Sequence, residues 1–194
     1  MNSIDTTKWI EFYSEFNPGE EDINEIIDLC MTLSPDDPRY NARRMMLQGY
    51  RLTCISDAQC KVVIERDPLR LLFLLIAAEN VSKMYHDFVD EGKSRAHVRG
   101  FFDTFCSDEE KNRIRTGIGE HLKPRSLESS IDILYDVRCD VVHEGMYYDF
   151  HFMTDGTPML TGTDPTIVVS ITIEEFRLIV VRSIYRAVKQ KISP

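Results

Sequence analysis

The sequence predicts a mainly α-helical protein that carries a small β-hairpin before its last helix. Apolar residues recur at helical spacing within residues 67–92, 126–145 and 173–191, as they do along the buried face of a helix. Residues 146–173, by contrast, alternate and are rich in Val, Ile and Thr, which is typical of extended strands. We therefore expect a helical bundle over residues 67–194, with the hairpin as an insertion at about 146–173 and residues 1–66 as an N-terminal helical extension.

Composition narrows the class of protein. The chain has 194 residues, 43% of them hydrophobic, which is enough for a domain-sized core. It has 23 basic against 32 acidic residues and a net charge of -9, which argues against broad coating of nucleic acid. Five cysteines without a C-x-x-C pair predict reduced thiols, with no zinc site and no disulfide framework.

The start of the chain and its longest apolar run bear on localisation. MNSIDTTKWIEF lacks the basic and apolar regions of a signal peptide. The run from Leu71 to Ala78 is too short to span a bilayer. We expect a cytoplasmic protein that needs neither a membrane nor a cofactor.

Residues 1–66 are predicted to form an accessory helical region. Aromatic residues at helical spacing predict a short first helix that ends before Pro18. A second helix ends at Ser34 and Pro35, and Tyr40 to Ile55 predicts a third. The segment from Ala58 to Arg66 fits a helix and a strand equally well. We identify no chemistry in this region.

A central helix is expected to follow, opened by Asp67 as N-cap and Pro68 in the first turn. It continues to about Gly92 and is apolar on nearly every side in its first turns, so it should be buried. Glu79 is the exception. It is either a solvated residue at the edge of the core or a carboxylate that pairs with and positions a later arginine, and we favour the pairing.

The charge balance reverses between residues 93 and 125, where basic residues outnumber acidic ones. Such a run is usually a solvated face, but it is also the best candidate surface for a phosphate backbone. The candidate RNA-binding residues are Arg95, Arg99, Lys111, Arg113 and Arg115.

Sequence signals also mark where the later helices begin and end. Two capping boxes, Ser107 with Glu110 and Thr172 with Glu175, predict helix starts. Ser126 is a candidate N-cap, and Gly145 fits the end of the same helix. Beyond it, Tyr147–Met153 and Thr166–Ile173 are predicted as the two strands of the hairpin, with a turn at Asp155 and Gly156.

The helix between Ser126 and Gly145 contains the main functional candidates. Its apolar seam of Leu127, Ile131 and Leu134 continues to Arg138, although burying a guanidinium costs several kcal/mol unless carboxylates or an anion satisfy it. His143 follows about 140° around the helix. Arg138 and His143 therefore either converge on one anion, or serve as a structural ion pair and a helix cap paired with Asp140.

The segment YDVRCDVVHEG, residues 135–145, resembles the signature of the HEPN superfamily (higher eukaryotes and prokaryotes nucleotide-binding). That signature is an arginine, four to six residues and a histidine, and one variant places a tyrosine before the arginine, as Tyr135 is here. The resemblance covers residues 67–191. It implies a helical homodimer with both motifs in one cleft. Active members are metal-independent endoribonucleases that use the ribose 2′-hydroxyl as nucleophile, often in toxin–antitoxin or defence systems.

By this resemblance Arg138 would hold the phosphate oxygens and His143 would move a proton, with an antitoxin or a nucleotidyltransferase as possible protein partner. Two departures favour the alternative of an inactive dimerisation scaffold or nucleotide sensor. Cys139 stands where active members usually have a polar residue, with Asp140 one place later. Flanking aspartates would also repel RNA unless the basic segment pairs with them, for example across the dimer.

Overall fold

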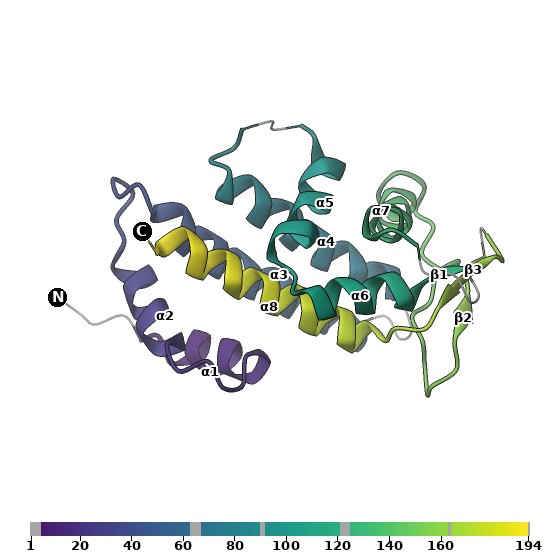
Figure 1. Ribbon diagram of the computed structural model, residues 1–194, viewed down its shortest axis with the longest axis horizontal. Helices are drawn as coiled ribbons and strands as arrows, with labels where there is room; N and C mark the ends of the chain where they lie inside the picture. Colours follow the sequence, from purple (N-terminus) through teal and green to yellow (C-terminus); the bar gives the residue numbers. More distant parts are fainter. Residues whose placement is uncertain (1–4, 63–66, 90–91, 121–124, 163, 194) are drawn as a thin grey trace.

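The computed structural model describes residues 5–62, 67–89, 92–120, 125–162 and 164–193, and shows eight helices and one small sheet in that part of the chain (Figure 1). The helices are α1 (Thr7–Phe16), α2 (Ile23–Thr32), α3 (Tyr40–Val62), α4 (Asp67–Tyr85), α5 (Ser94–Phe105), α6 (Asp108–Gly117), α7 (Leu127–Glu144) and α8 (Ile173–Ile192). The strands are β1 (Ile118–Glu120), β2 (Met159–Leu160) and β3 (Ile167–Val169). The predicted mainly helical fold is confirmed, and the described residues contain a small three-stranded antiparallel sheet.

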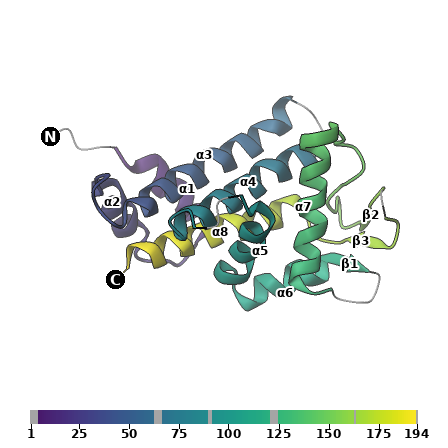
Figure 2. The same ribbon diagram turned by 90° about the horizontal axis from the view of Figure 1, so that it is seen from above.

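Helices α3, α4 and α8 run side by side along the length of the molecule, and α7 crosses one end of them (Figure 2). Helix α4 lies in the middle because it is apolar on nearly every side. Leu71, Leu74 and Ala78 are completely buried, as a helix without a polar face requires. Helix α5 packs on α4 and contributes Phe101 and Phe102, which are also completely buried.

The N-terminal region shares this core. Tyr13 is buried and its hydroxyl donates to the Met46 carbonyl at 2.8 Å. The Arg182 Nε of α8 donates to the Phe16 carbonyl at 2.7 Å. Helix α3 continues without a break to Val62, so the ambiguous segment is helical as far as the described residues reach. The described residues 5–62 and the later helices therefore contribute to one hydrophobic core.

A charge network ties three of the long helices together. Asp57 of α3 accepts from Arg177 of α8 at 2.6 Å and lies 3.7 Å from Arg70 of α4. Arg70 in turn donates to Glu174 of α8 at 2.7 Å. Both arginine side chains are mostly buried, so their charges depend on these carboxylates.

The predicted helix ends are mostly confirmed. Both capping boxes form, Ser126 caps α7 by accepting from the Ser129 amide, and Gly145 ends α7 with φ of 67°. Helix α4 differs in two ways. It begins at Asp67 itself, whose carboxylate accepts from the Phe152 amide at 2.9 Å, and it ends at Tyr85 instead of near Gly92.

The sheet corrects the predicted hairpin. Tyr147–Met153 is not a strand but an irregular segment that buries Phe150 and Phe152. The second predicted strand is present as β3, which pairs antiparallel with β2 through Met159 and Val169. Strand β1 joins the other edge of β3, with Ile118 opposite Val169. This three-residue strand precedes α7 in the chain and is too short to show an alternating pattern.

Candidate functional site

Arg138 stands where the apolar seam of α7 reaches the edge of the core. Ile131 and Leu134, which precede it on that seam, are completely buried, whereas the Arg138 side chain is 18% exposed. Its Nη2 lies 3.5 Å from Oε2 of Glu79 on α4. Its Cζ lies 5.2 Å from the centre of the Tyr135 ring, within the range of a cation–π contact. The structure thus brings Glu79, Tyr135 and Arg138 together.

Glu79 is a buried carboxylate that stays ionised. Burial by itself raises its pKa, but hydrogen bonds from Lys83 and Ser94, with the charges of Lys83 and Arg138, outweigh this and leave the pKa of Glu79 below its usual value. Lys83 Nζ and Ser94 Oγ each donate to Oε1 at 2.6 Å. Only the second oxygen, Oε2, is left for Arg138.

The remaining donors of Arg138 are available. Within the described residues its guanidinium has no hydrogen-bond or ion-pair partner other than Glu79. One contact fixes the position of the guanidinium, and its partial exposure leaves the other N–H groups able to reach a bound anion. Guanidinium N–H groups that have no protein partner can donate to an anion such as a phosphate.

His143 lies in the last turn of α7, where its side chain is exposed. In the part of the chain that the structure describes, its ring forms no hydrogen bond or ion pair, and the alternative pairing with Asp140 is not made. The ring is therefore free to act on a ligand. Arg138 and His143 are about 7.5 Å apart along the helix axis, at 1.5 Å per residue.

The neighbours of His143 are acidic. Asp140 is half-buried, and this burial, followed by the charges of Glu144, Asp136 and Asp149, raises the pKa of Asp140 above its usual value. Cys139 is a half-buried free thiol against the core. It lacks the polar reach of the side chain that active HEPN members usually place there.

The basic segment is largely neutralised within the chain. Arg99 Nε donates to Asp132 at 2.7 Å and its other nitrogens also reach Asp132 and Glu128, while Arg95 pairs with Asp136. Glu128, Asp132 and Asp136 of α7 are therefore paired within one chain and not across a dimer, whereas Asp140 has no basic partner among the described residues. Arg95 also lies over the Tyr135 ring at 4.7 Å.

The other three basic candidates are spread over α6. Arg113 forms two hydrogen bonds with Glu175, of 3.0 and 2.8 Å, and Lys111 lies 3.8 Å from Asp103. Arg115 is exposed and donates to the Arg125 carbonyl, with no carboxylate on it among the described residues. The five candidates do not form one open cationic surface.

Sequence reasoning missed Lys83 and Ser94, which hold Glu79. The pair of Glu79 and Lys83 has the i,i+4 spacing of a helical ion pair, so this signal was present. Ser94 comes from another helix, and its role depends on how α4 and α5 pack. No local pattern predicts it.

The comparisons with known proteins give no family. No protein-family model matches the chain, and no curated protein or solved structure matches it significantly. The likeness to HEPN domains thus rests on the motif and on the order of the helices. None of the described helices is long and apolar enough to cross a membrane. Among the described side chains no His, Cys, Asp or Glu cluster could hold a metal ion.

Proposed function

We propose that the protein is an HEPN-like, metal-independent endoribonuclease that works as a homodimer and uses Arg138 and His143. One observation carries the proposal: the Arg138 guanidinium contacts Glu79 and Tyr135 on one side, and its other donors have no partner among the described residues. The exposed His143, likewise without a partner in the described chain, lies at the same end of the helix. Placing an arginine on the apolar seam of a helix costs desolvation free energy, so the stability of the fold gives little reason for Arg138.

The residue types suit phosphodiester cleavage. A histidine acting as general base removes the proton of the ribose 2′-hydroxyl, whose oxygen attacks the adjacent phosphorus. The bond between the phosphorus and the leaving 5′-oxygen breaks, and a protonated histidine donates a proton to that oxygen. Arg138 stabilises the charge on the phosphorane oxygens. With one such histidine per chain, two-fold pairing would supply both the base and the acid.

A second candidate is a dimerisation scaffold without catalysis. The observations that favour it are the neutralised arginines of α5 and the acidic surroundings of His143, where the pKa of Asp140 is raised. In this alternative Arg138 is a structural partner of Glu79, and His143 has no role.

The test is cleavage of mixed RNA in EDTA by the wild type and by Arg138→Ala and His143→Ala, with end-group analysis of the products. We expect the wild type to leave 2′,3′-cyclic phosphate and 5′-hydroxyl ends, and each variant to lose roughly 100-fold or more. His86→Ala is the matched control, because His86 is an exposed histidine outside the site and should cleave like the wild type.

Two results separate the candidates. Equal cleavage by the wild type and His143→Ala would identify a contaminating nuclease and refute the assignment. If the wild type is inert at high concentration and Arg138→Ala weakens the fold or the dimer, the scaffold is the better account.

A further inference from the structure

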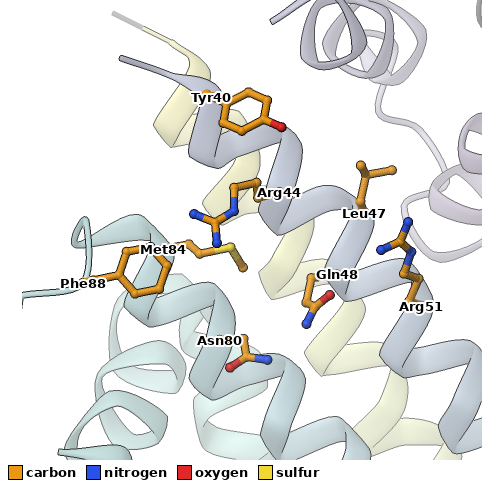
Figure 3. Close-up of a pocket in the computed structure, with 8 residues that line it drawn as sticks. All are labelled: Tyr40, Arg44, Leu47, Gln48, Arg51, Asn80, Met84 and Phe88. Atoms are coloured by element: carbon orange, nitrogen blue, oxygen red, sulfur yellow. The ribbon is translucent and has the colours of Figure 1, made fainter. Parts of the chain in front are cut away.

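A second site lies between α3 and α4, in the region where the sequence suggested no chemistry. It is a pocket of about 370 Å³ (Figure 3), within the usual size range of small-molecule sites. One wall is a face of α3 that includes Arg44, Gln48 and Arg51, and the other is formed by α4 and the turn that follows it. Neither Arg138 nor His143 lines it, so this site is independent of the proposed function.

The two arginines of this pocket, Arg44 and Arg51, have no carboxylate partner among the described residues. Arg44 Nη1 donates to the Asn41 side-chain oxygen at 3.0 Å, and Arg51 is exposed without a hydrogen bond or ion pair, as judged over the described ranges. Seven residues along one helix face separate them by about 10 Å. In a chain of net charge -9, two arginines without acids on one wall of a cavity favour an anionic ligand.

An aromatic ring is fixed at the rim of the same pocket. Asp87 and Phe88 have φ of 51° and 63°, a left-handed conformation that is uncommon for residues other than glycine and is often found at functional sites. Asp87 holds this turn by accepting from Asn41 at 2.8 Å and from Lys191 at 3.0 Å. The Phe88 ring, 37% exposed, thereby lies under the Arg44 guanidinium at 5.1 Å.

Two amides complete the lining. Gln48 on α3 and Asn80 on α4 lie opposite each other (Figure 3), and their side chains have no hydrogen-bond partner within the described residues. Each amide offers donors and an acceptor, so together they can bind the polar edge of a planar ring. Met84, which is buried beside Phe88, supplies an apolar, polarisable contact for its face.

We propose that this pocket binds a small organic anion that joins a phosphate to a planar heteroaromatic ring, the chemistry of a nucleoside monophosphate. The phosphate binds Arg44 and Arg51. The ring packs against Phe88 and Met84 and presents its polar edge to the two amides. A free nucleotide and a nucleotide within an RNA share this chemistry.

The experiment is isothermal titration of the full chain with AMP, GMP, CMP and UMP, and with adenosine, ribose 5-phosphate and an RNA trinucleotide. We expect at least one nucleotide to saturate one site per chain. Adenosine lacks the phosphate and ribose 5-phosphate lacks the ring, so the affinity of each should be at least about tenfold lower than that of the nucleotide. If the trinucleotide binds more tightly than the mononucleotides and Arg51→Gln abolishes this difference, the ligand is a nucleotide within an RNA. If the trinucleotide does not bind more tightly, the ligand is a free nucleotide.

Variants locate the site. Arg51→Gln removes an exposed side chain without a partner in the described chain, so the fold should be kept and nucleotide affinity should fall about tenfold. Phe88→Leu, which keeps an apolar side chain in the turn, should also bind more weakly. Arg39→Gln, the same substitution just before α3 and outside the pocket, and His143→Ala should bind like the wild type.

The proposal is overturned if none of the four nucleotides saturates a site at millimolar concentration. It is also overturned if Arg51→Gln binds as tightly as the wild type. Because His143→Ala is expected to retain binding, loss of RNA cleavage and loss of the pocket are separate results.

Discussion

The arginines of α5 and those of α3 differ in what surrounds them. Arg95 and Arg99, in the segment richest in basic residues, lie against carboxylates of α7. Arg44 and Arg51, in the acidic N-terminal region, have none on them within the described residues. Counting charges along the chain therefore identifies the arginines of α5, which are neutralised, and misses those of α3, which are not. Whether an arginine is neutralised depends on the side chains of the helix that packs against it.

Spacing explains the difference. Glu128, Asp132 and Asp136 recur every four residues on α7 and form one acidic stripe, which faces the arginines of α5 that are also four residues apart. Two stripes of opposite charge on packed helices neutralise each other. The face of α4 that meets Arg44 presents neutral side chains such as Asn80 and Met84 instead.

The largest effect is expected from Glu79→Gln, which removes the charge that three donors share. Lys83 and Arg138 then lose a buried counter-ion, so the free energy of unfolding should fall by about 2–3 kcal/mol at neutral pH. Because the pKa of Glu79 is lower in the folded protein than the usual value of 4.5, this stabilisation is complete above pH 4.5 and is lost as the pH falls through the folded pKa. Urea unfolding at several pH values measures both.

Glu128→Gln is the matched control for that prediction. It also removes a carboxylate from an arginine, but the Glu128 side chain is 63% exposed, so its loss should change stability by less than about 0.5 kcal/mol. Equal effects of the two variants would show that the Glu79 site is no more than a surface ion pair.

Asp57→Asn is expected to cost about 1–2 kcal/mol, because it leaves Arg70 and Arg177 with a weaker acceptor in a mostly buried place. The loss should appear in a single unfolding transition of the whole chain, because α3 shares one core with α4 and α8. Calorimetry of the wild type and the variant measures it.

Asp36→Asn is the control, since Asp36 is exposed and has no contact with that network among the described residues. The melting temperature of this variant should equal that of the wild type. Two separate transitions, with only the first shifted by Asp57→Asn, would show that residues 1–66 unfold as an independent unit.

How far the sequence predicts this molecule depends on whether a feature is local. The helix caps at Ser107, Ser126 and Thr172 follow from residues within one turn of each other, and all were predicted. The place of Glu79 beside Arg138 was expected because a seam arginine needs a partner. Tyr147–Met153 was mistaken for a strand because its alternating aromatics fill the core from an irregular segment.

Features that join distant segments could not be predicted. Strand β1 exists because β3, about fifty residues later in the chain, offers it a free edge. The pocket of Arg44 requires both the packing of α3 on α4 and the left-handed turn at Asp87 and Phe88, where the sequence predicted a continuing helix.

Arg99→Gln tests the neutralised surface directly. Since Asp132 and Glu128 already compensate this arginine, its loss should change RNA affinity by less than about twofold while lowering stability by about 0.5–1 kcal/mol. Fluorescence anisotropy with labelled RNA, in the His143→Ala background to prevent cleavage, measures the affinity. Arg115→Gln, which removes an exposed arginine without a carboxylate among the described residues, is the comparison, and a larger loss for Arg99→Gln would contradict the structure.

The smallest effect, and the one of opposite sign, is expected from Asp140→Asn. Partial burial and the nearby acids raise the pKa of Asp140 above the usual value of 3.8, so its negative charge opposes folding whenever it is ionised. The amide should stabilise the protein by a few tenths of a kcal/mol at neutral pH, or about 1 °C in melting temperature. The gain should vanish below pH 3.8, where the carboxyl is protonated in both the folded and the unfolded chain. If Asp140 contributes to the proposed active site, Asp140→Asn should lose RNA cleavage while it gains stability. A gain in both cleavage and stability would indicate that the Asp140 carboxylate only repels RNA.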